Sequence, residues 1–205
     1  MNKDRPLESI YMHTSSGMKY YPFAPQSEHV DAEVIAHHLA TRARWNGATQ
    51  HVNYPDRIFY SVAEHSVYVA LYLEAIMRRP DLALMGLLHD ASEAYNGDLI
   101  RPLKYSAEFA EPFKKVELLN EAAVGKRFQF PAELPPEVKI ADEAVCAAEL
   151  RQIVPKHPSE EWDSGKMHDE ERVAPFEIEM LLPFEAKKLF LSHFERLTMH
   201  RRVAA

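Results

Sequence analysis

Hydrophobic residues recur every three or four positions along most of this chain, which is the spacing of one buried face on an α-helix. The clearest case spans residues 61–78, whose apolar stripe consists of Val62, Val69, Leu73, Ile76 and Met77. The same spacing predicts further helices over residues 31–45, with Asp31 as N-cap, 80–95, 107–128, 137–154 and 176–201. Strand patterns are few, so we expect an all-α helical bundle.

A short β-hairpin over residues 7–25 is the expected exception. Two β-prone runs flank Thr14–Gly17, whose Thr-Ser-Ser-Gly composition is typical of a turn. The length of 205 residues suits one domain with a sizeable core. We expect a single domain over residues 1–205, made of a hairpin segment 1–30, a helical core 31–154, an irregular loop 155–175 and a C-terminal helical segment 176–205.

Polar side chains interrupt the apolar stripes of two predicted helices. His65 falls on the stripe of helix 61–78, and His89 and Asp90 follow the apolar run at Leu87-Leu88. His89 and Glu93 are four residues apart, so they share one face of the predicted helix 80–95. A buried charge costs several kcal/mol unless it is paired or metal-bound. A single core histidine is more often a hydrogen-bonded packing residue than a metal ligand. The adjacent His37 and His38 can be interpreted in the same two ways, as packing residues or as residues that contact a ligand.

A fourth polar residue on a core stripe suggests a metal site. Asp142 lies four residues after Val138 and three before Val145, at a core position of helix 137–154. The set His65, His89, Asp90 and Asp142 would supply two imidazoles and two carboxylates, with room for water. Mixed nitrogen and oxygen ligands favour a divalent transition metal over calcium. We expect Zn, Co, Mn or Mg, with one or more ions bound, and a bound metal lowers the pKa of its water toward ~7.

Other residues are placed to complete such a site. Glu93 could orient or deprotonate the water, and Asp98 emerges just past the end of its helix. A phosphate group would suit the basic side chains of Arg44, Lys104 and Lys139. Trp45 could present its ring to a sugar or base. The plain alternative is that Arg44 and Trp45 are only packing residues at a helix end.

Bulk properties narrow the classes of function. The net charge of −7 disfavours a nucleic-acid polymer as partner. No apolar run reaches the ~18 residues of a membrane span, and the first residues lack the apolar region of a signal peptide. The single cysteine, Cys146, fits a reducing cytoplasm, and its alanine-rich surroundings indicate a small core residue. We therefore expect a cytoplasmic protein, in the host cytoplasm if it is phage-encoded.

The order His65, His89-Asp90, Asp142 resembles the H…HD…D signature of the HD-domain metal-dependent phosphohydrolases. The segments around these ligands also look like family segments, namely Ser61–Ser66, Leu88–Ala94 and Ala141–Glu143. Gly97–Leu99 and Arg101–Lys104 are similar to the subset that hydrolyses 5′-deoxynucleotides. That subset includes the YfbR-type deoxynucleoside monophosphatases and the phage dATP triphosphohydrolases of the DatZ type. The resemblance covers roughly residues 14–154.

The resemblance implies a role for each candidate residue. His65, His89, Asp90 and Asp142 would be the metal ligands, with Glu93 and Asp98 as catalytic carboxylates. Arg44 would contact phosphate, and Trp45 would pack on the nucleoside and favour deoxyribose. Lys104 and Lys139 match positions that contact phosphates in the DatZ type.

The leading hypothesis is therefore metal-dependent hydrolysis of dATP to deoxyadenosine and triphosphate, with dADP and dAMP as further substrates. A broad 5′-deoxynucleoside monophosphatase is the alternative within the family. Cyclic-nucleotide or alarmone hydrolysis and a non-catalytic nucleotide-binding HD module are the other readings. The partner is expected to be a small deoxynucleotide, and the family resemblance suggests a homo-oligomer, either a dimer or a hexamer.

Overall fold

The structure, a computed structural model, describes residues 6–162 and 172–204. It is mostly helical with one small hairpin, which confirms the predicted fold class. The described residues fall into two compact units. Unit 1 is drawn from Met1–Leu39 and Asp90–Glu133, and unit 2 from Ala40–His89 and Leu134–Ala205. In the described part of the chain, no helix is both long and apolar enough to span a membrane.

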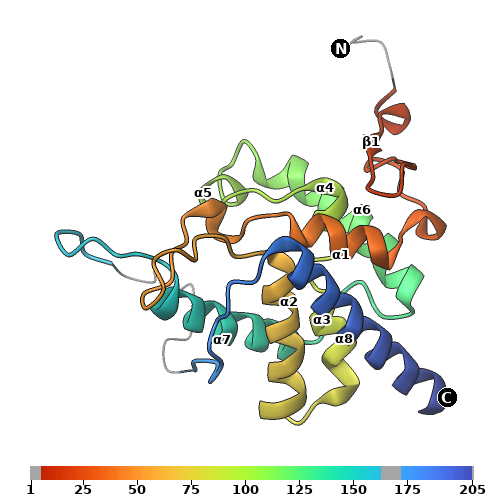
Figure 1. The fold of residues 1–205 in the computed structure, drawn as a ribbon. Helices are drawn as coiled ribbons and strands as arrows, with labels where there is room; N and C mark the ends of the chain where they lie inside the picture. Colours follow the sequence, from red (N-terminus) through yellow and green to blue (C-terminus); the bar gives the residue numbers. More distant parts are fainter. Residues whose placement is uncertain (1–5, 163–171, 205) are drawn as a thin grey trace. The chain divides into compact units, whose positions relative to one another are not determined.

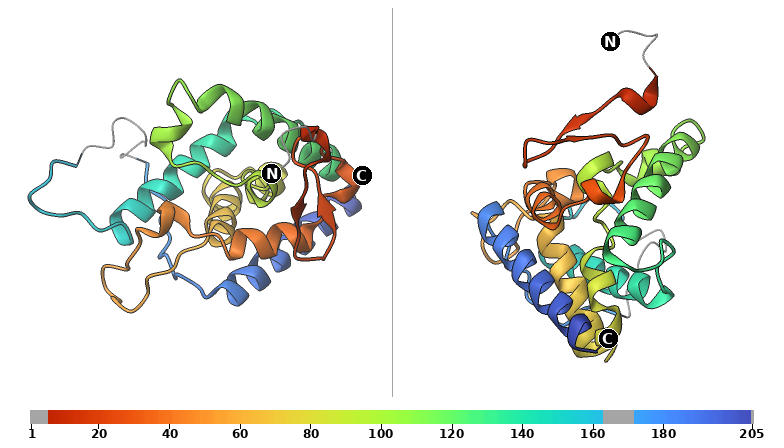
Figure 2. Two further views of the ribbon diagram at one scale, coloured as in Figure 1. Left: turned by 90° about the horizontal axis from the view of Figure 1, so that it is seen from above. Right: turned by 90° about the vertical axis from the view of Figure 1, so that its right-hand side faces the viewer.

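Unit 1 contains the predicted hairpin and a set of helices. Strands β1 (Met12–His13) and β2 (Lys19–Tyr20) pair antiparallel, with Met12 opposite Tyr20 (Figure 2). Gly17 closes the turn with a φ of 80°, a conformation that glycine adopts without strain. The other elements of this unit are η1 (Leu7–Ser9), η2 (Ser27–His29), α1 (Ala32–Ala40), α4 (Glu93–Asn96), α5 (Arg101–Lys104) and α6 (Ala110–Phe128).

Hydrogen bonds over long sequence separations hold unit 1 together. Tyr20 donates its hydroxyl to Asn120 Oδ1 at 2.9 Å, in the buried part of α6. His38 Nε2 accepts from the backbone N–H of Ser15 at 3.0 Å, and its Nδ1 lies 2.8 Å from the carbonyl oxygen of Ala94. Both ring nitrogens are therefore engaged, so His38 is a packing histidine that ties the hairpin turn to α4.

Unit 2 is built around α2 (Val62–Leu71), which packs against α3 (Ala83–Leu87), α7 (Pro136–Gln152) and α8 (Pro183–Ala204) (Figure 1). Its main core joins the stripe of α2 to the stripe of α7, as the spacing predicts. Val69 and Leu73 meet Val138 and Val145, all at most 2% exposed. Three short turns complete the unit: η3 (Arg44–Gly47), η4 (Tyr72–Ile76), which is a π-helical turn, and η5 (Pro80–Leu82).

The predicted helix 31–45 is too long. Asp31 caps α1 as expected, since its Oδ1 accepts from the N–H of Val34 at 3.1 Å, but the helix ends at Ala40. The next backbone groups pair elsewhere: Arg44 N–H donates to the carbonyl of Tyr60, and Val62 N–H donates to that of Arg42. Because these bonds compete with a helical ladder, Arg44 and Trp45 lie in the separate turn η3.

The predicted helix 80–95 is broken. Helix α3 ends at Leu87 and α4 begins at Glu93, so His89 and Glu93 do not share one helix face. His89 Nδ1 lies 2.8 Å from the carbonyl oxygen of Gly86. In a continued helix this oxygen would accept from the N–H of residue 90. The side chain of His89 therefore takes the place of the next helical hydrogen bond.

The last helix begins at Pro183, so the prediction of helix over residues 176–182 is wrong. Side chains of unit 2 satisfy the backbone there. Gln152 Oε1 accepts from the N–H of Ile178, and Gln152 Nε2 donates to the carbonyl of Phe176. Part of the predicted irregular loop 155–175, namely residues 163–171, lies outside the described residues.

Candidate metal centre

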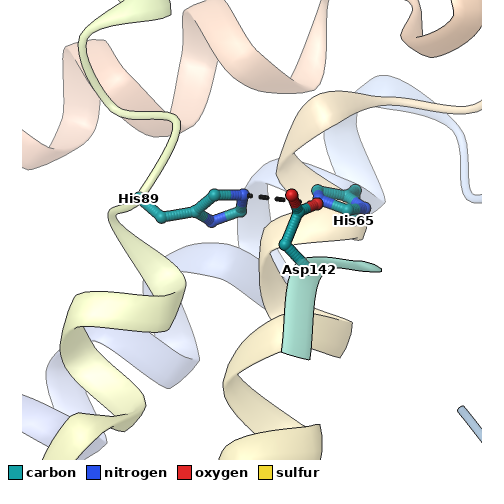
Figure 3. Close-up of side chains that lie close together, drawn as sticks. All are labelled: His65, His89 and Asp142. Carbon is teal, nitrogen blue, oxygen red and sulfur yellow. Dashed lines mark ion pairs between the residues drawn. The ribbon is translucent and has the colours of Figure 1, made fainter. Parts of the chain in front are cut away.

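His65, His89 and Asp142 converge in unit 2 although they lie far apart in the sequence (Figure 3). His65 Nε2 lies 3.1 Å from Asp142 Oδ1, and His89 Nε2 lies 3.9 Å from the same oxygen. The three potential ligand atoms are all within 4.8 Å of one another. The structure thus brings together three of the four ligands that the sequence predicts, and we call them the ligand trio.

The local structure fixes each member of the trio. Ser61 caps α2, with its hydroxyl accepting from Glu64 N–H at 3.1 Å, and so sets where His65 falls in the first turn. His65 is completely buried. Asp142 follows the buried Ala141 on α7 and keeps its side chain 28% exposed. This combination places a buried imidazole beside a carboxylate that solvent and a ligand can reach.

Three neighbouring side chains stabilise the ionised form of Asp142. Burial alone would raise the pKa of this carboxyl, but His65, His89 and Arg44 together hold it well below its usual value. Arg44 Nη2 lies 3.6 Å from Asp142 Oδ1 and 3.0 Å from Cys146 Sγ. Arg44 therefore lies beside the trio. Burial raises the pKa of the Cys146 thiol, which confirms a small, neutral core residue.

Glu149 belongs to this site, and the sequence reasoning missed it. Its side chain is fully buried, and its Oε1 lies 2.6 Å from His65 Nδ1. Although burial raises the pKa of this carboxyl, His65 and Arg44 outweigh it and the net shift is downward. The sequence spacing could have identified it, because Glu149 lies seven residues after Asp142 and thus on the same face of α7.

Trp45 is held in a strained conformation beside Glu149. Its φ of 54° lies in the left-handed region, which is unusual for a bulky residue. Its indole Nε1 donates to Glu149 Oε2 at 2.7 Å. Strain of this kind persists only where surrounding contacts fix it, and it is concentrated at functional sites. Arg44 and Trp45 thus share one buried acceptor, the carboxylate of Glu149.

The chemistry of the trio fits a divalent metal. The ionised Glu149 can only accept at His65 Nδ1, so the ring proton of a neutral His65 sits on Nδ1 and Nε2 carries a lone pair. His65 Nε2 is buried and faces Asp142 Oδ1 at 3.1 Å, so its lone pair and the carboxylate oxygen are close enough to bind one cation. A second potential group, His65 with Cys146 and Glu149, is fully buried. Its carboxylate already accepts hydrogen bonds from His65, Tyr60 and Trp45, so the trio is the better site.

The remaining predicted acidic residues and Lys104 lie in unit 1. Asp90 begins the second segment of that unit, Asp90–Glu133, and Glu93 is buried at the start of α4. Lys104 Nζ lies 2.8 Å from Asp98 and 3.2 Å from Glu117. Burial would lower the pKa of this lysine, but Asp98 and Glu117 raise it above its usual value. The functional roles of these residues stay predictions.

Lys139 does not join the trio. Its side chain is 78% exposed, and it pairs with Glu143 one turn along α7 at 3.8 Å. It therefore lies on the solvent side of the helix, although it precedes Asp142 by only three residues. A contact between Lys139 and a substrate phosphate stays a prediction.

Comparisons with known proteins place the chain in a family. The HD domain family matches residues 62–145, a span that contains all three residues of the trio. An uncharacterized protein of Rhodobacter capsulatus is 38% identical over 150 residues, which cover 71% of this chain and 71% of that protein. The uncharacterized protein YfdR of Escherichia coli is 26% identical over 95% of this chain and 99% of its own length.

A 5′-deoxynucleotidase of Pectobacterium atrosepticum is also similar. It is 30% identical over 107 residues, which cover 46% of this chain and 53% of that protein. The family match, the relative from Rhodobacter and the spacing of the trio agree with one another. This chain therefore belongs to the HD-domain family.

Proposed function

We propose that the chain is a metal-dependent phosphohydrolase of 2′-deoxynucleoside 5′-phosphates. The observation that carries this proposal is the ligand trio with Arg44 beside it, three candidate metal ligands and a positively charged side chain in one place. His65, His89 and Asp142 would hold the metal, with Asp90 as the predicted fourth ligand. When bound, the metal would supply an activated water and polarise a phosphoryl oxygen.

The side chains of this site have separate tasks. Arg44 presents a fixed positive charge that suits the oxygens of a phosphate group. Trp45 offers an aromatic face to the nucleoside, where close packing against the sugar would disfavour a 2′-hydroxyl. Glu93 remains the proposed group that orients or deprotonates the attacking water, and Asp98 the second catalytic carboxylate.

Monophosphates are the substrates that the observations favour. The relative from Pectobacterium and one from Erwinia tasmaniensis are both named 5′-deoxynucleotidase. The expectation of dATP as substrate rests on resemblance to the DatZ type, and the two lysines that this resemblance assigns to phosphate, Lys104 and Lys139, are both paired with carboxylates in this structure.

The dATP triphosphohydrolase remains the second candidate, because the sequence around Lys104 and Lys139 resembles that type. The two activities release different products. A monophosphatase yields inorganic phosphate from dAMP, whereas a triphosphohydrolase yields triphosphate from dATP. Product analysis therefore separates them without reference to the structure.

A substrate panel tests the proposal. The chelator-treated protein is reloaded with Mn²⁺ or Co²⁺ and assayed on dAMP, dGMP, dATP, AMP and cyclic AMP. We expect hydrolysis of the deoxynucleoside monophosphates, its loss on chelation and its return with metal. Asp90→Ala and Asp142→Ala should abolish it. Full activity after chelation and in Asp90→Ala would show that the metal mechanism is wrong, and an inert protein would favour a binding module.

A further inference from the structure

The carboxylate of Glu149 receives hydrogen bonds from two parts of the site at once. Its Oε1 lies 2.6 Å from His65 Nδ1 and accepts from the hydroxyl of Tyr60 at 2.9 Å. Its Oε2 accepts from Trp45 Nε1 at 2.7 Å and from Arg44 Nε at 3.4 Å. One oxygen thus faces a residue of the ligand trio, and the other faces the pair Arg44–Trp45.

We propose that Glu149 is a positioning residue that couples the metal centre to the pair that binds the nucleotide. This inference rests on the proposed function, because it assigns the trio to a metal and Arg44–Trp45 to a substrate. Through Oε1, Glu149 fixes the tautomer and ring orientation of His65, as carboxylates behind metal-binding histidines do. Through Oε2, the same group fixes the indole of Trp45 and the guanidinium of Arg44.

Only a carboxylate has the hydrogen-bonding capacity that this position requires. Each of its two oxygens accepts from two donors, and the ionised group has no proton of its own to place. Glu149 is completely buried, so water cannot replace a lost partner. The left-handed backbone of Trp45 needs a strong side-chain anchor, and the bond to Glu149 Oε2 provides one.

An amide at this position satisfies only one side of the site. In the Glu149→Gln variant, one terminal atom is still an oxygen, but the other is an NH₂ group that donates. If the NH₂ group faces Arg44 and Trp45, it meets two donors. If it faces His65 and Tyr60, it meets the Nδ1 proton and forces the ring to change tautomer or turn. The substitution therefore disturbs one half of the site directly and the other half through the shared group.

The first measurement is the affinity of the chelator-treated full chain for Mn²⁺, by titration calorimetry. We expect Glu149→Gln to bind Mn²⁺ about 10- to 100-fold more weakly than wild type, the range typical for loss of a carboxylate behind a metal-binding histidine. The matched control is Glu195→Gln, which makes the same chemical change at an exposed position of α8 and should bind as wild type does. An unchanged affinity in Glu149→Gln would overturn the coupling.

The second measurement is substrate selectivity at saturating Mn²⁺. The ratio of kcat/KM for dAMP over AMP should fall in Glu149→Gln, with the larger change in KM, because the indole that packs on the sugar is no longer fixed. A ratio equal to that of wild type would also overturn the inference. If wild type itself neither binds Mn²⁺ nor hydrolyses the panel, the proposed function has failed instead, which is a different result.

A third measurement needs no change at Glu149. The chain has two tryptophans, and Trp162 is exposed, so the Trp162→Phe protein reports Trp45 alone. Zn²⁺, which is spectroscopically silent, should change the Trp45 emission along a curve with the same Kd that calorimetry gives for Zn²⁺. Metal binding without any change in emission would contradict the coupling, even if Glu149→Gln does not fold.

Discussion

The imidazole of His89 turns back onto its own helix, and its Nδ1 lies 2.8 Å from the carbonyl oxygen of Gly86. This contact ends α3 and directs Nε2 toward Asp142, 3.9 Å away. Gly86 also lies against α2 and the π-helical turn η4 that continues it, where an added Cβ would clash with Leu73 Cδ1 of η4 and touch Val69 Cγ1 of α2. One glycine therefore serves both the packing of two helices and the placement of a metal-ligand candidate.

Gly86→Ala should destabilise the chain by ~1–3 kcal/mol, because the added Cβ would overlap Leu73 Cδ1, which belongs to a fully buried side chain. The displaced helix should also weaken Mn²⁺ binding through His89. Urea unfolding followed by circular dichroism measures the first effect. In a Leu73→Ala background the clash is absent, so the added cost of Gly86→Ala should shrink. An equal cost in both backgrounds would mean that the close contact is not the cause.

Mn²⁺ should raise the melting temperature of the wild-type protein, because a ligand that binds only the folded state stabilises it. The gain is about 2.7 kcal/mol at a free metal concentration of about 100 times Kd. Asp142→Asn removes the charge but almost none of the volume, so without metal it should still fold, with a lower melting temperature because the ion pair with Arg44 is lost, and it should lose the shift. Differential scanning fluorimetry with and without Mn²⁺ makes the comparison. A shift that survives in Asp142→Asn would place the metal elsewhere.

Glu64 anchors the segment that precedes α8. Its carboxylate accepts from the N–H of Met180 at 2.9 Å and of Leu181 at 2.8 Å, and its side chain is fully buried. Glu64→Ala would leave two backbone donors without an acceptor, at a cost of ~2–5 kcal/mol in the free energy of unfolding. Glu64→Gln keeps one acceptor oxygen and should cost less. Glu195→Ala on exposed α8 is the control, and equal stabilities for all three variants would contradict this role.

His193 should make stability depend on pH. Its Nδ1 accepts from Arg196 at 3.1 Å, and burial together with Arg196 lowers its pKa from the usual value of 6.5. A lowered pKa means that the unfolded chain binds the proton more readily, so the free energy of unfolding should fall as pH drops below 6.5.

The measurement for His193 is the urea midpoint at about pH 7.5 and about pH 5.5. The decrease in the urea midpoint from the higher to the lower pH should be smaller in His193→Gln than in wild type, because the glutamine has no proton to gain. The exposed His29, changed to glutamine, should leave the decrease unaltered. If His193→Gln shows the same decrease in the urea midpoint as wild type, other titratable groups cause the pH dependence.

Local pattern was sufficient to predict most helices and the residues that face the core. Val138 and Val145 lie on the α7 stripe as predicted, and His65 faces the interior as its place among apolar residues indicated. These features depend on the helical repeat, which relates residues only a few positions apart. The hairpin turn at Thr14–Gly17 was predictable for the same reason, since turn chemistry is local.

Helix ends were less predictable, because bonds from distant residues decide them. The predicted end of the first helix at residue 45 failed because Tyr60 and Val62 pair with the backbone at Arg44 and Arg42. The predicted helix 80–95 failed because one histidine side chain occupies a carbonyl oxygen that helical spacing assigns to the next backbone N–H. The spacing of hydrophobic residues contains no information about either of these competing hydrogen bonds.

The sequence by itself determined the chemical types at the site: two histidines, an aspartate and an arginine, at positions that burial and spacing make exceptional. Only the tertiary structure decided that Glu149 joins them. A glutamate on a helix is usually solvated, and its role here depends on donors 84 to 105 residues away that fold onto one buried carboxylate. Partners at such separations are set by the packing of whole helices, which no short stretch of sequence specifies.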